Sequence, residues 1–174
     1  MTIDFEDAHK NLGELISWYE NNVSERKRNE ATTRLHLVDR ILFECLGWER
    51  SDCKLEERVN GKYVDYSFLC PECLLIVEAK KEGIYFELPI GMTRLKYGIN
   101  FFSRQKQAKG VYKAIEQAIT YCQSHGTPYG AVCNGHQFVA FLGSRNDGRP
   151  PLEGQALVFD SLQTLNDNFL VAWQ

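Results

Sequence analysis

Residues 65–80 read Asp-Tyr-Ser-Phe-Leu-Cys-Pro-Glu-Cys-Leu-Leu-Ile-Val-Glu-Ala-Lys, and this stretch decides the predicted fold. Aromatic and aliphatic side chains typical of a buried, pleated surface fill residues 64–69 and 74–79. Pro71-Glu72 separates the two runs at the point where a hairpin would turn. The stretch therefore predicts two antiparallel strands at the centre of a sheet.

Pairing across this hairpin follows from its symmetry. If the two cysteines that flank the turn face each other, three further pairs follow along the strands: Leu69 with Leu74, Phe68 with Leu75, and Asp65 with Glu78. Facing residues of an antiparallel pair have Cβ atoms about 4.5–5.5 Å apart, so the two carboxylates are expected side by side. Lys80 follows Glu78 by two residues and projects from the same face.

Two adjacent carboxylates and a lysine predict a metal site. Like charges at this range raise the pKa of at least one carboxyl group unless a cation holds the pair together. Mg²⁺ prefers oxygen ligands and keeps several waters, and Mn²⁺ is expected to substitute for it. Lys80 would then orient or deprotonate a water, or stabilise charge on a phosphate. An ordinary hairpin with a salt bridge from Lys80 to a neighbouring acid remains the alternative.

Length and composition predict one domain that spans residues 1–174. With 174 residues, of which 44% are hydrophobic, the chain is long enough for one domain with a core and too short for two comfortable domains. The formal net charge of -3 gives no support to nucleic-acid binding by the chain as a whole. Any surface that binds nucleic acid must therefore be local.

The N-terminus and the cysteines indicate a cytoplasmic protein. The start of the chain has no basic region followed by an apolar core, and no apolar run approaches the roughly 18 residues of a membrane span. The six cysteines do not form a spaced framework, which fits reduced thiols. We therefore expect no membrane association.

Two helices are predicted before the hairpin. Residues 4–22 carry apolar side chains at helical spacing, so residues 1–23 are interpreted as a packing helix. After a charged joint at 24–29, a second helix is expected to run to Leu46 and to stop at Gly47. Its predicted buried stripe consists of Leu35, Val38, Leu42 and Cys45.

Glu30 lies near the start of the second helix. Counted by turns, it shares a face with Arg34 and Ile41, so it points toward the surface on which the apolar stripe packs. A first-turn glutamate that is favoured by the helix dipole and paired with Arg34 would occupy the same position. Both interpretations stay open.

The other elements predict a mixed sheet with helices on its faces. Further strands are expected at 54–58, before the turn Asn60-Gly61, at 129–133 and 137–142, about the turn Asn134-Gly135, and at 156–159. Residues 84–90 and 96–102 predict a peripheral hairpin bent at Gly91. Helices are expected at 107–125 and 161–173. The predicted fold class is therefore α/β, a mixed α+β arrangement with a central mixed sheet.

A local basic surface is predicted between Gly91 and Ile115, where no acidic residue occurs. Its cations are Arg94, Lys96, Arg104, Lys106, Lys109 and Lys113. Such a stretch in an acidic protein indicates contact with a phosphate backbone, although a solvated face would have the same composition.

Lys113, Gln117 and Tyr121 recur every four residues and form one polar ridge of the predicted helix 107–125. Polar ridges are usually solvent faces. An amide and a phenol in line with a lysine would also suit the binding of a phosphate or a catalytic water, so this ridge is a candidate part of the site.

The assembled motifs resemble the N-terminal nuclease domain of type I restriction enzyme R subunits, in the PD-(D/E)XK nuclease superfamily. The resemblance extends from about residue 27 to the end. Its matching stretches are Asn29-Glu-Ala-Thr-Thr-Arg34, Leu46-Gly-Trp48, Val64-Asp65, Ile76-Val-Glu-Ala-Lys80, Gln117-x-x-x-Tyr121, Val132-Cys-Asn-Gly135 and Ala156-Leu-Val-Phe-Asp-Ser-Leu162.

The resemblance implies a restriction-endonuclease-like core and a role for each polar residue that matches. It makes Asp65 and Glu78 metal ligands, Lys80 the catalytic lysine, Glu30 a further acid that helps to hold the metal or its water, and Gln117 and Tyr121 a motif beside the active site. Two departures are Val64, where the superfamily name has proline, and the short Cys-Pro-Glu-Cys turn.

Three functions follow from these patterns. The first is a Mg²⁺-dependent DNA endonuclease that acts in restriction or antiviral defence, and the second is a non-catalytic module that binds nucleic acid. The third is a structural zinc domain built on Cys70 and Cys73, although zinc needs four ligands and no second pair with this spacing follows.

The last predicted helix carries no stop signal before Gln174. We therefore expect the 174 residues to be the N-terminal nuclease part of a longer polypeptide. An ATPase or sensor region would follow in cis or be supplied by a partner subunit. Homo-oligomer formation is left open.

Overall fold

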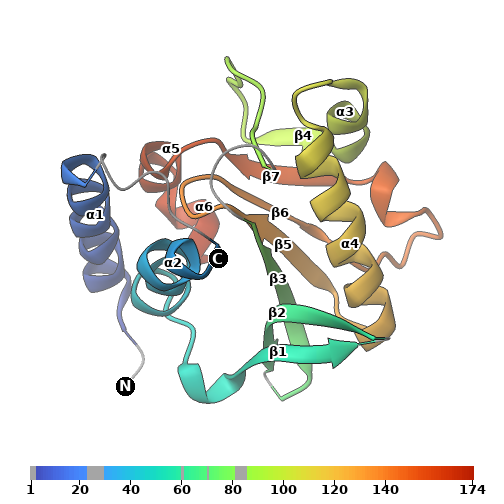
Figure 1. Ribbon diagram of the computed structural model, residues 1–174, viewed down its shortest axis with the longest axis horizontal. Helices are drawn as coiled ribbons and strands as arrows, with labels where there is room; N and C mark the ends of the chain where they lie inside the picture. Colours follow the sequence, from blue (N-terminus) through green and yellow to red (C-terminus); the bar gives the residue numbers. More distant parts are fainter. Residues whose placement is uncertain (1–2, 23–29, 60, 70, 81–85) are drawn as a thin grey trace.

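A seven-stranded mixed sheet forms the centre of the protein in the computed structural model (Figure 1). The structure describes residues 3–22, 30–59, 61–69, 71–80 and 86–174, without the side chains of residues 30, 31, 59, 62 and 73. The strands follow the order β1-β2-β3-β5-β6-β7-β4. Their bounds are Cys53–Val59 (β1), Lys62–Leu69 (β2), Cys73–Ala79 (β3), Lys96–Gly98 (β4), Tyr129–Cys133 (β5), Phe138–Leu142 (β6) and Gln155–Phe159 (β7).

The predicted fold class is confirmed, because helices flank this mixed sheet on both sides. β3 and β5 pair in parallel, whereas all the other neighbouring strands pair antiparallel. A parallel pair needs a long crossover, and here the chain passes through β4, α3 (Ile99–Arg104) and α4 (Lys109–His125) between β3 and β5.

The central hairpin has the predicted register over most of its length. Phe68 faces Leu75, as expected, and Tyr66 faces Val77. The prediction that Leu69 faces Leu74 is wrong, because Leu69 faces Cys73 after a register shift. A shift of this kind between Phe68 and Leu69 is typical of a β-bulge.

One face of the sheet packs against the helices of the two chain ends. These are α1 (Phe5–Asn21), α2 (Glu30–Thr33), the segments η2 (Arg34–Val38) and η3 (Arg40–Cys45), α5 (Leu162–Asp167) and α6 (Phe169–Trp173). The predicted N-terminal packing helix is confirmed. The side chain of Asp4 accepts a hydrogen bond from the amide of Asp7 at 2.9 Å, and Leu12 and Leu15 are buried.

The second predicted helix differs from a regular α-helix, because η2 and η3 are π-helical. These wider turns change which positions face inward. Leu35 is 62% exposed, so its place in the predicted stripe is wrong. The buried side chains of these segments are Leu37, Val38, Ile41, Leu42 and Cys45. The helix stops as predicted at Gly47, which has a positive φ of 71°.

The C-terminal helix is also interrupted. Ser161 caps its start as expected, since its hydroxyl accepts a hydrogen bond from the amide of Thr164 at 3.0 Å. At Asn168 the backbone leaves the helical region, and the side-chain amide of Asn168 donates to the carbonyl of Thr164 at 2.9 Å. The prediction of one continuous helix is therefore wrong, and α5 and α6 are two short helices.

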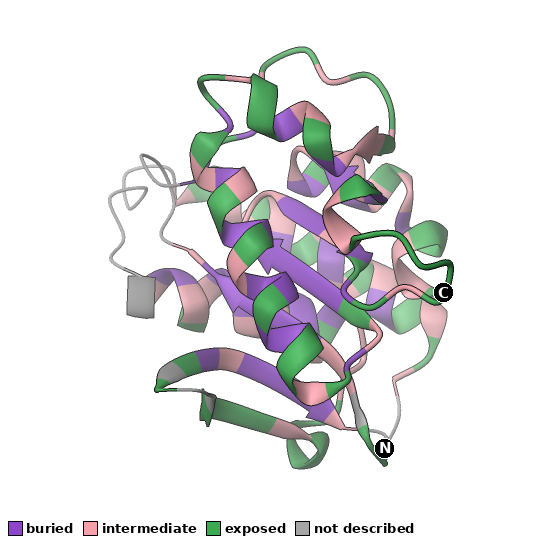
Figure 2. Ribbon diagram, turned by 90° about the vertical axis from the view of Figure 1, so that its right-hand side faces the viewer, coloured by how far each residue is buried: buried purple, intermediate pink, exposed green. Residues whose placement is uncertain are grey.

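The opposite face of the sheet is covered by α3 and α4. α4 was predicted, and it ends at Gly126, which has a φ of 67° in the left-handed region. Its buried side chains, among them Val111 and Ile115, share a core with Val132 and Val139 of the sheet. Figure 2 shows this burial in the central strands and along α4, whereas β1 at the sheet edge is largely exposed.

The predicted peripheral hairpin is wrong. Residues 84 and 85 lie outside the described part of the chain, and residues 87–95 form no strand. Residues 96–98 form β4, which pairs with β7, and residues 99–104 form α3. The aromatic residues that suggested a strand lie in this helix because burial of Ile99 and Phe102 next to α4 outweighs their strand propensity.

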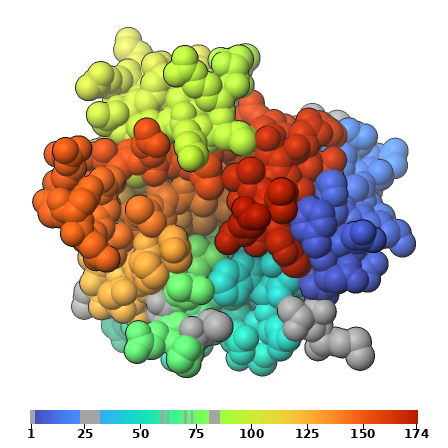
Figure 3. All heavy atoms as spheres, turned by 180° about the vertical axis from the view of Figure 1, so that it is seen from behind, coloured from blue at the N-terminus to red at the C-terminus, as the bar shows by residue number. Residues whose placement is uncertain are grey.

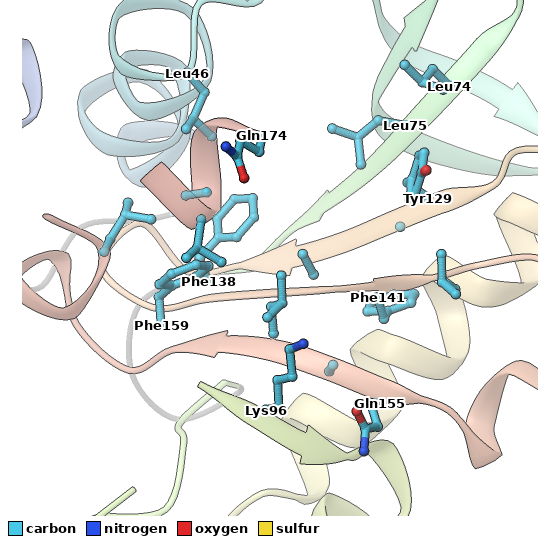
Figure 4. Close-up of a pocket in the computed structure, with 18 of the residues that line it drawn as sticks. Leu46, Leu74, Leu75, Lys96, Tyr129, Phe138, Phe141, Gln155, Phe159 and Gln174 are labelled. Atoms are coloured by element: carbon cyan, nitrogen blue, oxygen red, sulfur yellow. The ribbon is translucent and has the colours of Figure 1, made fainter. Parts of the chain in front are cut away.

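The molecule is hollowed on its rear side between the C-terminal helices and the central strands (Figure 3). Apolar side chains of β3, β5, β6, β7 and α6 line this groove, which has a volume of about 600 Å³. Figure 4 shows Leu75, Tyr129 and Phe159 on its walls and Lys96 at one side. Among the described residues, no helix is long and apolar enough to cross a membrane.

Candidate active site

The central hairpin places the two predicted carboxylates next to each other. Tyr66 and Val77 form the last recorded pair of the ladder; Asp65 precedes Tyr66 and Glu78 follows Val77, so both carboxylates lie one position beyond this pair. The backbone amide of Ala79 donates a hydrogen bond to Oδ2 of Asp65 at 2.8 Å, which ties this carboxylate to the end of β3. Asp65, Glu78 and Lys80 therefore lie around the same end of the hairpin.

Glu78 is only 3% exposed, and its carboxylate has both a cationic and a neutral partner. Nζ of Lys80 forms an ion pair with Oε1 of Glu78. Nε2 of Gln117 donates to the same oxygen at 2.6 Å. A buried carboxylate needs such partners because its desolvation is costly.

Gln117 links the end of β3 to helix α4. Its Oε1 accepts a hydrogen bond from Nζ of Lys80 at 3.3 Å, and its Nε2 also donates to the hydroxyl of Tyr121 at 3.0 Å. The predicted polar ridge of α4 therefore faces the hairpin at Gln117 and Tyr121. Lys113, one turn earlier, is exposed.

Tyr121 is buried beside the carboxylate of Glu78. Burial raises the pKa of its hydroxyl, the hydrogen bond from Gln117 acts in the opposite direction, and the charge of Glu78 raises the pKa further. The net pKa is raised, so the hydroxyl stays protonated at neutral pH. Tyr121 can therefore act as a hydrogen-bond donor or acceptor near the site.

Arg34 is a site residue that the sequence predictions did not include. Its Nη1 lies 3.4 Å from Oδ1 of Asp65 and 3.3 Å from Oε1 of Glu56. Arg34 was noted as a neighbour of Glu30 on the helix and as the last residue of the matching stretch Asn29-Glu-Ala-Thr-Thr-Arg34, but no role was assigned to it. The expected repulsion between Asp65 and Glu78 is reduced, because each carboxylate has a cation of its own.

Tyr66 contacts the guanidinium of Arg34 through both its hydroxyl and its ring. Nε of Arg34 donates to the hydroxyl of Tyr66 at 3.4 Å, and the guanidinium lies 5.0 Å from the centre of the tyrosine ring. The hydroxyl in turn donates to Oδ1 of Asp39 at 2.6 Å. This chain of contacts runs from the helical segment through the sheet to the candidate site.

The electrostatic effects on Arg34 and Tyr66 agree with these contacts. Burial by itself lowers the pKa of Arg34, but the hydrogen bond to Tyr66 and the charge of Asp65 outweigh it, so the pKa is raised. Burial, followed by the hydrogen bond to Asp39, raises the pKa of Tyr66. Arg34 is therefore charged and Tyr66 neutral at any physiological pH.

Glu56 has an unusual backbone conformation opposite this site. It is the one described residue other than glycine with a positive φ, and its value is 52°. Left-handed backbone costs a residue with a Cβ atom roughly 1–2 kcal/mol. Strain of this kind occurs preferentially at functional sites, and here it coincides with the contact to Arg34.

Glu30 is the first residue of α2, which leads into Arg34. Its side chain lies outside the described part of the structure, so its role as a ligand stays a prediction. Cys70 also lies outside the described residues, and Cys73 begins β3 without a described side chain. The zinc alternative therefore stays untested.

The six cations of the predicted basic surface are all exposed but lie on different elements. Lys109 and Lys113 are on α4, the helix that carries Gln117. Arg104 ends α3, and Lys106 lies between α3 and α4. Lys96, in contrast, lines the apolar groove beside α6, away from the candidate site, and Arg94 precedes it. Phosphate contact by these residues stays a prediction.

The donor set at the hairpin suits a hard divalent cation. Asp65 and Glu78 supply carboxylate oxygens, the type of ligand that Mg²⁺ prefers. Mg²⁺ needs only one or two carboxylates together with waters. In the described part of the chain, no group of three or more His, Cys, Asp or Glu side chains is placed to hold a metal ion. Glu30 stays the predicted further carboxylate, and its side chain lies outside the described residues.

Comparison with known proteins does not identify the chain. No family model matches it, and no curated protein or solved structure matches it significantly.

Proposed function

We propose that the protein is a metal-dependent DNA endonuclease that hydrolyses phosphodiester bonds. The observation that carries this proposal is the hydrogen-bonded cluster of Glu78, Lys80 and Gln117 beside Asp65. It combines two carboxylates for a cation with a positioned lysine at one end of a hairpin. The sequence resemblance to restriction nuclease domains supports the same activity.

Asp65 and Glu78 would hold Mg²⁺, which supplies Lewis-acid stabilisation of the phosphate and lowers the pKa of an attacking water. Lys80 has three N–H donors, and Glu78 and Gln117 accept from two of them. The third is available among the described residues for a phosphate oxygen or a water. Gln117 positions both Glu78 and Lys80, and the hydroxyl of Tyr121 accepts a further hydrogen bond from Gln117.

DNA is the proposed substrate because α4 offers cations in line with this cluster. Lys109 and Lys113 precede Gln117 on the helix and are exposed. Contacts from such lysines to phosphates would position the backbone without reading its sequence. By resemblance, the setting would be cytoplasmic defence against foreign DNA, with an ATPase or sensor region in cis or in a partner subunit.

The test is cleavage of supercoiled plasmid in Mg²⁺ or Mn²⁺. We expect nicking or linearisation by the wild type and a loss of about 10²–10³-fold in rate for Lys80→Ala, because a positioned donor to the transition state is lost. Asp65→Asn and Glu78→Gln should also abolish cleavage. Lys10→Ala, an exposed change on α1, is the matched control and should cleave like the wild type.

A non-catalytic nucleic-acid-binding module is the second candidate. It is favoured by the observation that Arg34 and Lys80 already neutralise Asp65 and Glu78. Plasmid binding without cleavage in either cation would select this candidate. Cleavage by all three site variants at the wild-type rate would instead rule out the proposed active site.

A further inference from the structure

We infer that Arg34 is a positioning residue. Without a divalent cation, the guanidinium of Arg34 holds Asp65, and when the cation binds to Asp65, the guanidinium moves to Glu56. This inference rests on the proposed function. It concerns how Asp65 is kept in place before the cation arrives, and what sets the affinity of the site for that cation.

The position of Nη1 of Arg34 carries the inference. This nitrogen lies 3.3 Å from Oε1 of Glu56 and 3.4 Å from Oδ1 of Asp65. Because the two carboxylates share one nitrogen, a small movement toward Glu56 frees Oδ1 of Asp65 while the guanidinium keeps an anionic partner. This exchange of partners keeps the half-buried charge of the Arg34 guanidinium paired with a carboxylate.

The rest of the Arg34 side chain is fixed. Nε donates to Tyr66, whose hydroxyl is in turn held by Asp39 at 2.6 Å. The guanidinium also lies over the tyrosine ring, and only 19% of the Arg34 side chain is exposed. Movement of Nη1 between the two carboxylates is therefore confined to a small rotation of the planar guanidinium about its Nε end.

Asp65 is held at both of its oxygens. Oδ2 accepts a hydrogen bond from the amide of Ala79 at 2.8 Å, and Oδ1 faces Arg34. The carboxylate is thereby oriented at the end of the hairpin without a metal ion. A cation that approaches Oδ1 meets the positive charge of Arg34, so binding of the cation and contact with Arg34 compete.

Glu56 is suited to be the second partner. Its side chain is 67% exposed, so it can accept the guanidinium at little desolvation cost. Its φ of 52° is an uncommon backbone conformation in a strand, and such outliers cluster in switch regions and ligand clamps. The residue with this conformation, Glu56, is the one that accepts a hydrogen bond from Nη1 of Arg34, the nitrogen that also contacts Asp65.

The experiment compares Mn²⁺ binding by the intact chain in the wild type, Arg34→Gln and Arg40→Gln at constant ionic strength, measured by calorimetry without DNA. Arg40 is the matched control, because it lies in the next helical segment and pairs with Glu44 at 3.0 Å, away from the site. We expect Arg34→Gln to bind Mn²⁺ about 5- to 150-fold more tightly, the usual range of coupling between two binding events. Its cation-free form should melt at a lower temperature.

Glu56→Gln provides a second, exposed variant in case Arg34→Gln does not fold. With its alternative partner removed, Arg34 should stay on Asp65, so Mn²⁺ should bind more weakly than to the wild type. An unchanged affinity in both variants would overturn the inference and leave Arg34 a purely structural residue. Weaker binding by Arg34→Gln would overturn it as well, because Arg34 would then assist the cation.

These outcomes are separable from the proposed function. If the wild type binds Mn²⁺ and cleaves plasmid while neither variant changes the affinity, only the inference fails. If Arg34→Gln binds Mn²⁺ and the wild type does not, the inference is supported. Absence of binding in the wild type and in both variants, together with absence of cleavage, would overturn the proposed function and the inference together.

Discussion

At the scale of single residues, the candidate site depends on how a buried charge is compensated. Glu78 is the one charged side chain among the buried residues that the structure describes. Moving a carboxylate into a protein interior costs several kcal/mol, and the ion pair with Lys80 and the hydrogen bond from Gln117 offset this cost. Asp65 has its own compensation in Arg34. Removal of Asp65 is therefore not expected to relieve repulsion between the two carboxylates.

Glu56 gives a prediction about backbone strain. Glycine adopts a positive φ without the penalty that a Cβ atom brings, so Glu56→Gly should be more stable than Glu56→Ala by about 1 kcal/mol. In an ordinary strand glycine is the less stable of the two. The measurement is the free energy of unfolding in urea for both variants.

The neighbouring residue Glu57 provides the control, because its φ is not positive. There, Glu57→Ala should be more stable than Glu57→Gly. The same order at both positions would show that the conformation of Glu56 carries no strain.

At the scale of elements, α4 connects the hydrophobic core to the candidate site. Its apolar side packs on β3 and β5, while Gln117 on the same helix reaches Glu78 and Lys80. Lys109 and Lys113 extend the helix surface beyond this cluster. Under the proposed function, the helix would hold the groups of this cluster and a phosphate backbone at a fixed separation.

This arrangement predicts the salt dependence of DNA binding. Each phosphate contact that a lysine makes contributes roughly 0.9 to the slope of log affinity against log salt. The double variant Lys109→Gln with Lys113→Gln should therefore bind all DNA sequences more weakly and with a slope that is smaller by up to about 1.8. Fluorescence anisotropy at several salt concentrations measures the slope.

Lys10→Gln on α1 is the matched control for charge, since Lys10 is exposed and pairs only with Glu14 at 3.9 Å in the described structure. Because this control removes one positive charge and the double variant removes two, a slope that falls half as much in the control would assign the effect to net charge. A slope unchanged in the double variant would make the surface of α4 an ordinary solvated face.

At the scale of the whole molecule, the core that joins the sheet to the terminal helices contains buried thiols. Cys45 lies on the helical segment and Cys133 at the end of β5, and both belong to this core. Burial raises the pKa of each thiol from 9.0 to about 12. The folded protein therefore keeps protons that the unfolded chain releases in alkaline solution.

Stability should consequently fall as the pH rises from about 9 toward 12. Below pH 9 the folded and the unfolded chain both keep the thiol protons, so the free energy of unfolding does not depend on these groups. Between pH 9 and about 12 only the unfolded chain releases the protons, which favours unfolding. Each buried thiol then lowers the free energy of unfolding by up to about 1.4 kcal/mol per pH unit. Urea unfolding at pH 8, 9 and 10 measures this slope. The double variant Cys45→Ala with Cys133→Ala should have a shallower slope, and an equal slope would contradict the assignment to these thiols.

Local sequence signals determined much of the fold. Alternating apolar runs set the strands around Phe68 and Leu75, and their symmetry predicted the register that brings Asp65 toward Glu78. Gly126 and Ser161 marked helix boundaries because a left-handed residue and a capping hydroxyl act within one turn of the chain. These features depend on neighbours in sequence, so the sequence by itself was sufficient to predict them.

Only the tertiary structure decided the features that depend on distant packing. The strand-like aromatic residues near Phe102 became helical because α4 buries them, and the π-turns left Leu35 exposed. The contact of Arg34 with Asp65 and Glu56 joins the segment η2 to the hairpin of β1 and β2, which lies more than 20 residues further along the chain. No local sequence pattern predicts this contact, because it depends on how the helical segment packs over the edge of the sheet.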